Sequence, residues 1–289
     1  MSLAIPRGAV DCHVHVVGPL ARFPQQPSRH YTAALATLED LRATAGPEVR
    51  RFVVVQPSFY GTDNEATLQA CDTLNGNGRA VAVVDPTQVD DAQAGQLQAR
   101  GVAGLRINLN SRLKDDHRQI QGVLAQHAAL AQRMGWHLQL VLPFSALIGA
   151  ARMIEPLPVP VVIDHFGLPL GKSPDSGEGR ALRDLVGMQH VWVKLSAPYR
   201  LGLGEYNTET PRDWLAAMLE AGADRCLWGS DWPHVPPASE HKGPDSTPPN
   251  RSLHYGDLLG DFLAALGNAD LAQRILVENP GRLYGFSPI

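Results

Sequence analysis

Residues 51–85, RFVVVQPSFYGTDNEATLQACDTLNGNGRAVAVVD, contain two short apolar runs separated by a polar stretch. The runs 51–57 (RFVVVQP) and 79–85 (RAVAVVD) are nearly continuous in apolar residues, which is typical of parallel strands buried on both faces. Parallel strands need a crossover connection, and residues 64–74 between the runs have the pattern of a helix. This stretch is therefore predicted to form one strand–helix–strand unit.

The same alternation recurs along the whole chain. The predicted strands are Val10–Val17, Arg51–Pro57, Arg79–Asp85, Val102–Leu109, Trp136–Leu142, Val159–Gly167, Val191–Tyr199 and Cys226–His234. The predicted helices are Thr32–Ala45, Asn64–Leu74, Asp90–Arg100, His117–Met134, Ser145–Ile154, Gly179–Val186, Arg212–Ala221, Tyr255–Leu266 and Asp270–Leu283, the last broken at Pro280.

Eight strands alternating with helices predict an α/β fold, a (β/α)8 TIM barrel that forms a single domain over residues 1–289. An open, doubly wound sheet would also show strands and helices alternating along the sequence. Such a sheet normally has fewer strands and a glycine-rich first turn, which is missing here. In a barrel the functional site lies at the C-terminal ends of the strands. Residues 18–30 and 235–250, which read as loops after the first and last strands, are expected at that face.

Net charge, apolar runs and cysteine content indicate which kinds of binding partner the protein can have. The 289 residues carry a formal net charge of −4, so a general attraction to nucleic acid or to an anionic membrane is not expected. The sequence shows no signal peptide and no apolar run long enough to span a bilayer. Cys12, Cys71 and Cys226 are widely spaced and form no CxxC pair, as expected of buried thiols in a reducing compartment. A cytoplasmic protein with a small-molecule ligand is predicted.

Three strand ends carry residues suited to catalysis. In DCHVHVVGP (11–19), His13 and His15 are two positions apart, so both side chains face the barrel lumen. The sixth predicted strand ends in IDHFG with His165, and the eighth ends in WGSDWPH with Asp231 and His234. A carboxylate at the end of an apolar strand is costly unless it is paired. These residues are therefore candidates for one polar site.

Basic residues accompany this polar group. Arg106 and Asn108 share one face of the fourth strand, in GLRINL, and Arg112 follows it. Guanidinium groups bind carboxylates with two parallel hydrogen bonds, which suits an anionic substrate. Lys194, inside the seventh strand, is expected either to pair with a barrel carboxylate or to belong to the site.

The combination of DCHVHVVGP, QPSFYGTDN, GLRINL, IDHFG, VKLSAPYR and WGSDWPH resembles the amidohydrolase superfamily, and within it the 2-pyrone-4,6-dicarboxylate lactonase group. The resemblance covers nearly the whole chain. It implies hydrolysis of a carboxylated ring lactone, with Asp231 activating water and with His165, His13 and His15 donating hydrogen bonds to the lactone carbonyl. It also implies that the substrate is held by Arg106, Arg112, Tyr31, Ser58, Asn108, His234 and Arg200.

The resemblance also bears on metal binding. Superfamily members that hold one divalent ion use the HxH pair, a histidine on the fifth strand and the aspartate on the eighth. Here Gln139 aligns with the rim of the fifth strand, and His137 is expected to lie too deep to meet His13 and His15. The fourth strand has no lysine for a bridging carbamate. No cofactor is therefore expected; the alternative is one zinc-like ion held by His13, His15, His165 and Asp231.

Other functions remain open at this point. A divalent-metal-dependent hydrolase or decarboxylase and an aldonolactone hydrolase or isomerase would share most of these polar residues. A barrel that binds a carboxylate without converting it is the alternative outside enzymes. The presence of Asp231, His165 and the HxH pair argues against that last alternative, because a barrel that had lost activity would not need a base.

Overall fold

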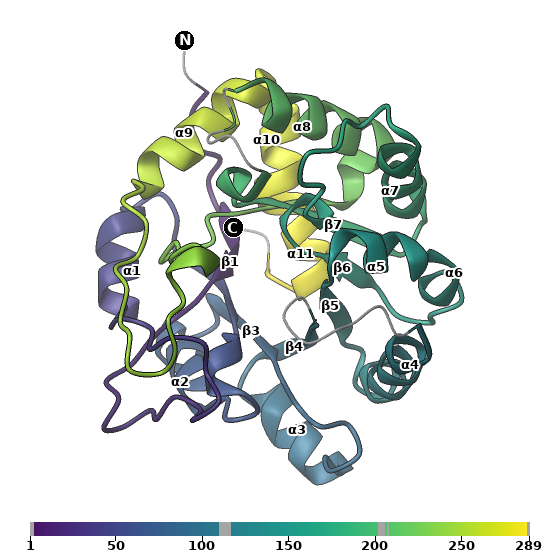
Figure 1. Ribbon diagram of the computed structural model, residues 1–289. Helices are drawn as coiled ribbons and strands as arrows, with labels where there is room; N and C mark the ends of the chain where they lie inside the picture. Colours follow the sequence, from purple (N-terminus) through teal and green to yellow (C-terminus); the bar gives the residue numbers. More distant parts are fainter. Residues whose placement is uncertain (1–2, 110–116, 202–205, 207, 288–289) are drawn as a thin grey trace.

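The computed structural model describes residues 3–109, 117–201, 206 and 208–287. Eight parallel strands follow one another in sequence order within one sheet and form a nearly closed barrel (Figure 1). The strands are β1 (Val10–Val14), β2 (Arg51–Val55), β3 (Gly78–Ala82), β4 (Val102–Asn108), β5 (His137–Val141), β6 (Val161–Ile163), β7 (Val191–Ser196) and β8 (Cys226–Gly229). The predicted single-domain (β/α)8 barrel is confirmed.

A ring of helices surrounds the strands (Figure 1). The α-helices are α1 (Leu38–Ala45), α2 (Glu65–Leu74), α3 (Asp91–Ala99), α4 (His117–Met134), α5 (Phe144–Gly149), α6 (Ala151–Ile154), α7 (Gly177–Gly187), α8 (Glu209–Gly222), α9 (Tyr255–Leu266), α10 (Ala269–Gln273) and α11 (Asn279–Tyr284). Short 3-10 turns are η1 (Ser58–Tyr60), η2 (His165–Gly167), η3 (Pro198–Leu201), η4 (Ala223–Arg225) and η5 (Ala238–Glu240), and η6 (Arg274–Glu278) is a π-helical turn. Within the described residues, no helix is long and apolar enough to cross a membrane.

The barrel closes between its first and last strands. Just beyond β8, the backbone N–H of Asp231 donates to the His13 carbonyl (2.9 Å), and the N–H of His15 donates to the Trp232 carbonyl (2.8 Å). Gly229 permits this approach, because a Cβ atom there would lie 2.6 Å from the Cβ of His13. The closure therefore places β1 beside the end of β8 and brings their polar side chains together.

The opposite end of the barrel is closed by the C-terminal segment. Tyr284 and Phe286 belong to the apolar cluster inside the barrel, with Val10 and Trp192. The guanidinium of Arg79, from the start of β3, stacks over the Phe286 ring at 4.6 Å. Substrate access is therefore expected at the C-terminal ends of the strands.

The first predicted helix begins later than expected. Residues 32–36 are not helical, and Ala36 exchanges backbone hydrogen bonds with Val17. The helix starts at Leu38 because Thr37 forms a capping box with Asp40. Leu35 is consequently 58% exposed, and the spacing of leucines that suggested a longer helix was misleading.

The later helices differ in similar detail. The predicted helix Ser145–Ile154 is two short helices, α5 and α6. The final predicted helix is interrupted by the π-helical turn 274–278 and not at Pro280. Pro280 lies in the first turn of α11, where the missing backbone N–H costs nothing.

Candidate active site

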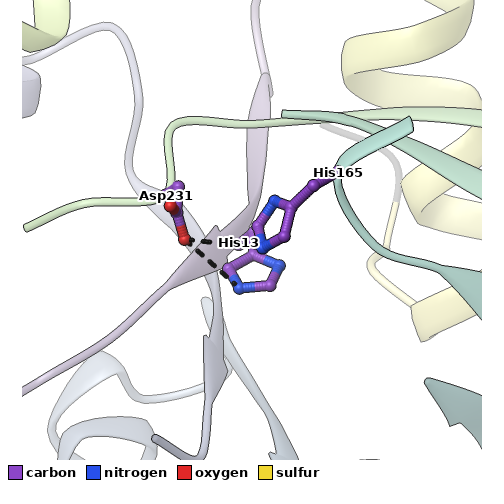
Figure 2. A group of neighbouring side chains, drawn as sticks. All are labelled: His13, His165 and Asp231. Atoms are coloured by element: carbon purple, nitrogen blue, oxygen red, sulfur yellow. Dashed lines mark ion pairs between the residues drawn. The ribbon is translucent and has the colours of Figure 1, made fainter. Parts of the chain in front are cut away.

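Four side chains meet above the apolar part of the barrel. Figure 2 shows His13 from β1 and His165 from η2 pointing toward Asp231. Oδ1 of Asp231 lies 3.6 Å from Nε2 of His13 and 3.8 Å from Nε2 of His165. His15 completes the group, with its Nε2 3.7 Å from the same oxygen and 3.3 Å from Nε2 of His13. The convergence of these four residues, expected from the strand ends, is present in the structure.

Unusual backbone conformations aim two of these side chains. Asp231 has φ = +61° and His165 has φ = +52°, in the left-handed region that non-glycine residues rarely adopt. Each such residue costs of the order of 1 kcal/mol and persists only where the surrounding structure imposes it. Here both strained residues lie two positions beyond the end of a strand, β6 for His165 and β8 for Asp231, and their side chains turn toward each other.

Asp231 is held by two neighbours through a single oxygen. Its Oδ2 accepts hydrogen bonds from the Tyr199 hydroxyl (2.6 Å) and from Nε and Nη2 of Arg200 (3.0 Å each). Oδ1 has no hydrogen-bond partner among the described residues. Burial alone would raise the pKa of Asp231, but Arg200 and the three imidazoles outweigh it and hold the pKa well below its usual range. The carboxylate is therefore ionised, with one oxygen available to accept a proton.

The sequence only partly anticipated these neighbours. Arg200 was expected to bind substrate; the structure shows it anchoring Asp231. The role of Tyr199 was missed, although its position beside Arg200 in VKLSAPYR was a usable signal. His234 packs edge-on against Tyr199, with ring centroids 6.1 Å apart, and does not line the cavity. Its expected contact with substrate is therefore not supported.

Hydrogen-bond partners define how the imidazoles act. Nδ1 of His15 lies 2.7 Å from the Val55 carbonyl, which only accepts, so this nitrogen carries the hydrogen. Burial and Arg106 lower the pKa of His15 to about 4, so the ring is neutral near pH 7. Its Nε2 is then an acceptor. This arrangement does not favour the expected donation from His15 to a lactone carbonyl, and suits the ring to orienting water.

His165 has a different partner. Its Nδ1 lies 2.8 Å from the Ser196 hydroxyl, which can donate as well as accept. Burial lowers the pKa of His165 to about 4. A neutral ring that accepts from Ser196 presents an N–H at Nε2, so His165 can still donate toward the cavity.

A second polar layer lies under the histidines. Asp164 Oδ1 is 3.3 Å from Nδ1 of His13 and 3.6 Å from Nζ of Lys194, and Asp164 Oδ2 accepts from Nε2 of Gln139 (2.9 Å). Burial would raise the pKa of Asp164, but His13 and Lys194 beside it keep the pKa well below its usual range. The expected pairing of Lys194 with a barrel carboxylate is confirmed. Asp164 itself was missed, although it shares the lumen face of β6 with Val162.

The fifth strand contributes no histidine to the site. Gln139 is bonded to Lys194 and Asp164. His137 lies deeper, against Tyr284, with ring centroids 5.2 Å apart. Gly104 leaves room for this ring, since a Cβ atom there would lie 2.2 Å from it. The expectation that His137 is too deep to reach His13 and His15 is confirmed.

A cavity of about 360 Å³ opens above the polar group. Arg106 lines it and is only 6% exposed; Nη1 of Arg106 donates to the Gln56 carbonyl (2.9 Å). Burial raises the pKa of Tyr31 to about 12, so its phenol stays neutral and can donate a hydrogen bond. Of the residues expected to hold substrate, the cavity is lined by Arg106, Asn108, Tyr31, Ser58 and Arg200. Arg112 lies outside the described residues.

Two rim loops, residues 18–32 and 235–250, are tied together beside this cavity. The Tyr31 ring stacks on His241 at a centroid distance of 4.2 Å. Arg29 donates from Nε to the Thr32 hydroxyl (2.8 Å), from Nη1 to the Gln26 carbonyl (3.0 Å) and from Nη2 to the Pro244 carbonyl (3.1 Å). Arg29 thus links the two rim loops next to Tyr31, because it bonds to Gln26 and Thr32 in the first loop and to Pro244 in the second.

Replacing Arg29 with Met should lower the free energy of unfolding by about 1–2 kcal/mol, because several hydrogen bonds to carbonyl groups are lost. Urea denaturation followed by circular dichroism measures the change. Arg133→Met is the matched control; Arg133 is exposed and pairs with Asp91 at the surface, so its loss should change stability by less than about 0.5 kcal/mol. Equal stability of the two variants would show that Arg29 does not hold the rim loops together.

Comparison with known proteins agrees with this geometry. The Amidohydrolase family model matches residues 10–286. A 2-pyrone-4,6-dicarboxylate hydrolase of Comamonas testosteroni is 37% identical, covering 97% of this chain and 91% of that protein. A 4-sulfomuconolactone hydrolase of Rhizobium radiobacter is 31% identical, covering 99% of this chain and 92% of that protein.

A solved structure supports the same relationship. A crystal structure from Acinetobacter baumannii, described as a "probable 2-pyrone-4,6-dicarboxylic acid hydrolase" with citric acid bound, has a TM-score of 0.80 and 26% identity, covering 96% of this chain and 100% of that chain. The fold, the strand-end residues and these similarities agree along nearly the full length. This protein belongs to the Amidohydrolase family.

Proposed function

We propose that this protein opens a small ring lactone that carries at least one carboxylate, by adding water across the ester bond. One observation carries the proposal: Oδ1 of the ionised Asp231 has no hydrogen-bond partner among the described residues and faces three imidazoles at 3.6–3.8 Å beneath a cavity lined by Arg106. A buried carboxylate with one free oxygen suits a general base. The names of the relatives, both lactone hydrolases, support the same chemistry.

The reaction follows from the positions of these groups. Asp231 Oδ1 takes one proton from a water molecule as the water oxygen bonds to the lactone carbonyl carbon. His15 Nε2 accepts the other water hydrogen and orients the nucleophile. The negative charge that develops on the carbonyl oxygen is stabilised by the N–H group of His165, which lines the cavity, and by that of His13, which is fully buried behind the lining. The ring carbon–oxygen bond then breaks, and the departing ring oxygen takes up the proton that Asp231 removed from water, which returns Asp231 to its ionised form.

The substrate is proposed to be anionic. Arg106 is buried in the cavity wall, its Nε has no hydrogen-bond partner among the described residues and lies 3.9 Å from Oδ2 of Asp164, and a guanidinium placed in this way suits a carboxylate. Arg112 remains the proposed second anchor, with Tyr31, Ser58 and Asn108 as hydrogen-bonding groups. The relatives are named for a dicarboxylate and a sulfonated lactone, and the similar crystal structure holds citric acid. A pyrone dicarboxylate or a closely similar lactone is the proposed substrate class.

The spacing of the nitrogen and oxygen atoms in this site can be compared with the spacing of ligands around one divalent ion. Ligands bound at about 2.0–2.2 Å in tetrahedral geometry lie about 3.3–3.6 Å apart, and the ligand atoms of His13, His165 and Asp231 all lie within 4.8 Å of one another. His13, His165 and Asp231 could therefore hold such an ion, which would acidify water and polarise the carbonyl. His15, the fourth residue of the expected ligand set, is not part of this closely spaced group. We nevertheless propose metal-independent hydrolysis, because β5 supplies Gln139 in place of a histidine and the proton transfer above needs only side chains.

The decisive experiment is a spectrophotometric screen of pyrone and sugar-acid lactones, with and without a chelator. Hydrolysis of a carboxylated pyrone lactone, unchanged by the chelator, is the expected result. Activity that is lost with the chelator and restored by zinc would establish the metal-dependent alternative. Turnover of sugar-acid lactones alone would redirect the substrate class. Tight binding of carboxylates without any turnover would favour a binding protein.

The cytoplasm is the proposed location. Cys12, Cys71 and Cys226 are all buried and unpaired, and free thiols persist in a reducing compartment.

A further inference from the structure

Lys194 is fully buried inside the barrel, directly under the histidines. Its Nζ donates to Oε1 of Gln139 (2.6 Å) and lies 3.3 Å from Nδ1 of His13 and 3.6 Å from Oδ1 of Asp164. Lysine is among the residues most rarely buried in this way. The steps of hydrolysis described above do not use it, so its position needs another explanation.

The contact between His13 and His15 supplies that explanation. Their Nε2 atoms are 3.3 Å apart. His15 uses its hydrogen on Nδ1, which donates to the Val55 carbonyl, so Nε2 of His15 presents a lone pair. The contact is a hydrogen bond only if Nε2 of His13 carries a hydrogen. If it did not, two lone pairs would face each other in a buried site.

The other nitrogen of His13 then has to accept. Nδ1 of His13 has two neighbours at 3.3 Å, Lys194 Nζ and Asp164 Oδ1. Asp164 would accept a hydrogen from Nδ1 and leave Nε2 bare, whereas Lys194 would donate to Nδ1 and leave the hydrogen on Nε2. Only the second arrangement gives a continuous chain of donors from Lys194 through His13 and His15 to the Val55 carbonyl.

We propose that Lys194 is a positioning residue, which donates to Nδ1 of His13 and thereby keeps the hydrogen of that ring on Nε2, the nitrogen nearest to His15 and Asp231. In the free protein that hydrogen is donated to Nε2 of His15. The proposal rests on the proposed function for its use in the reaction, in which the hydrogen turns to the lactone carbonyl and Nε2 of His15 becomes available to accept from water. It also explains how a group with the spacing of a metal site serves as a hydrogen-bonding site. A nitrogen that carries a hydrogen cannot bind a metal ion, and metal-binding histidines instead hold their hydrogen on the opposite nitrogen, bonded to a partner such as a carboxylate. By donating to Nδ1 of His13, Lys194 prevents Asp164 from accepting a hydrogen from that nitrogen.

The first test is the tautomer of His13 in the full, unmodified protein. Long-range ¹H–¹⁵N NMR of protein labelled at its 11 histidines distinguishes an Nε2–H ring from an Nδ1–H ring. His13→Gln assigns the signal. The expected result is an Nε2–H ring for His13 and an Nδ1–H ring for His15. An Nδ1–H ring for His13 overturns the proposal, whether or not the protein hydrolyses a lactone, and this measurement does not require any lysine variant to fold.

The second test is Lys194→Met, which removes the donor and retains the length of the side chain. His13 should change to the Nδ1–H tautomer, bonded to Asp164, and zinc affinity measured by competition with a chromophoric chelator should rise by about tenfold or more. Lys172→Met is the control; Lys172 pairs with Glu178 at the surface, so the variant should leave tautomer and zinc affinity unchanged. An unaltered tautomer and zinc affinity in folded Lys194→Met contradict the proposal. Neither readout depends on lactone turnover, so failure of the proposed function is seen separately.

Discussion

Replacing Asp231 with Asn should lower kcat for lactone hydrolysis by about 10²–10⁴-fold, the range that a positioned general base contributes. The amide has the shape of the carboxylate, and its oxygen can still accept hydrogen bonds from Tyr199 and Arg200, which hold Asp231 through Oδ2. What it lacks is a group able to take the proton from water. Steady-state kinetics, together with substrate binding measured by calorimetry, separate the loss of chemistry from a loss of affinity.

The matched control is Asp213→Asn, which removes a carboxylate from the exposed face of α8. This variant should retain the parent kcat. If Asp231→Asn also retained most of kcat, Asp231 would not be the base, and His15, whose bare Nε2 lies 3.7 Å from Asp231 Oδ1, would be the next candidate.

Arg106→Gln should lower kcat/KM by about 10²–10³-fold, mainly through a higher KM. The guanidinium is 6% exposed, and losing one partner of a buried, hydrogen-bonded charge pair costs about 2–5 kcal/mol. Gln preserves a polar group able to donate to the Gln56 carbonyl, which accepts from Arg106 at 2.9 Å. Kinetics on a carboxylated lactone measure the effect.

A neutral methyl ester of the same lactone is the internal control for Arg106. If Arg106 binds the carboxylate, the difference between parent and Arg106→Gln should shrink to within a few-fold on this ester. Arg133→Gln, at an exposed site on α4, should behave as the parent on both substrates. An equal loss on the acid and the ester would show that Arg106 shapes the cavity and does not bind the carboxylate.

The barrel was predictable because its pattern is local and repeated. Each strand is a short apolar run of limited length, and each crossover is a separate segment, so the eight units could be recognised one at a time. Element ends were less predictable. The late start of α1 depends on the Thr37–Asp40 capping box and on the Val17–Ala36 pairing, and the second of these joins residues far apart in the chain.

The central group of the site was also predictable, because residue parity and strand ends place His13, His15, His165 and Asp231 at one rim. The direction of each hydrogen bond was not. Whether His15 donates or accepts is decided by the Val55 carbonyl of the neighbouring strand. The partners of Asp231, Tyr199 and Arg200, lie in the short turn after β7. Side chains in such a turn do not alternate regularly between the two faces, so the sequence could not show which way they point.

The seam between β1 and β8 has a consequence for how activity arises. His13 and Asp231 exchange a backbone hydrogen bond across this seam, so the reacting groups come from the two extremes of the barrel sequence. No fragment that lacks either extreme contains the site. During synthesis, the site can therefore form only after the ribosome has translated the eighth strand and the residues that follow it. Shorter nascent chains are expected to have no activity toward the substrate.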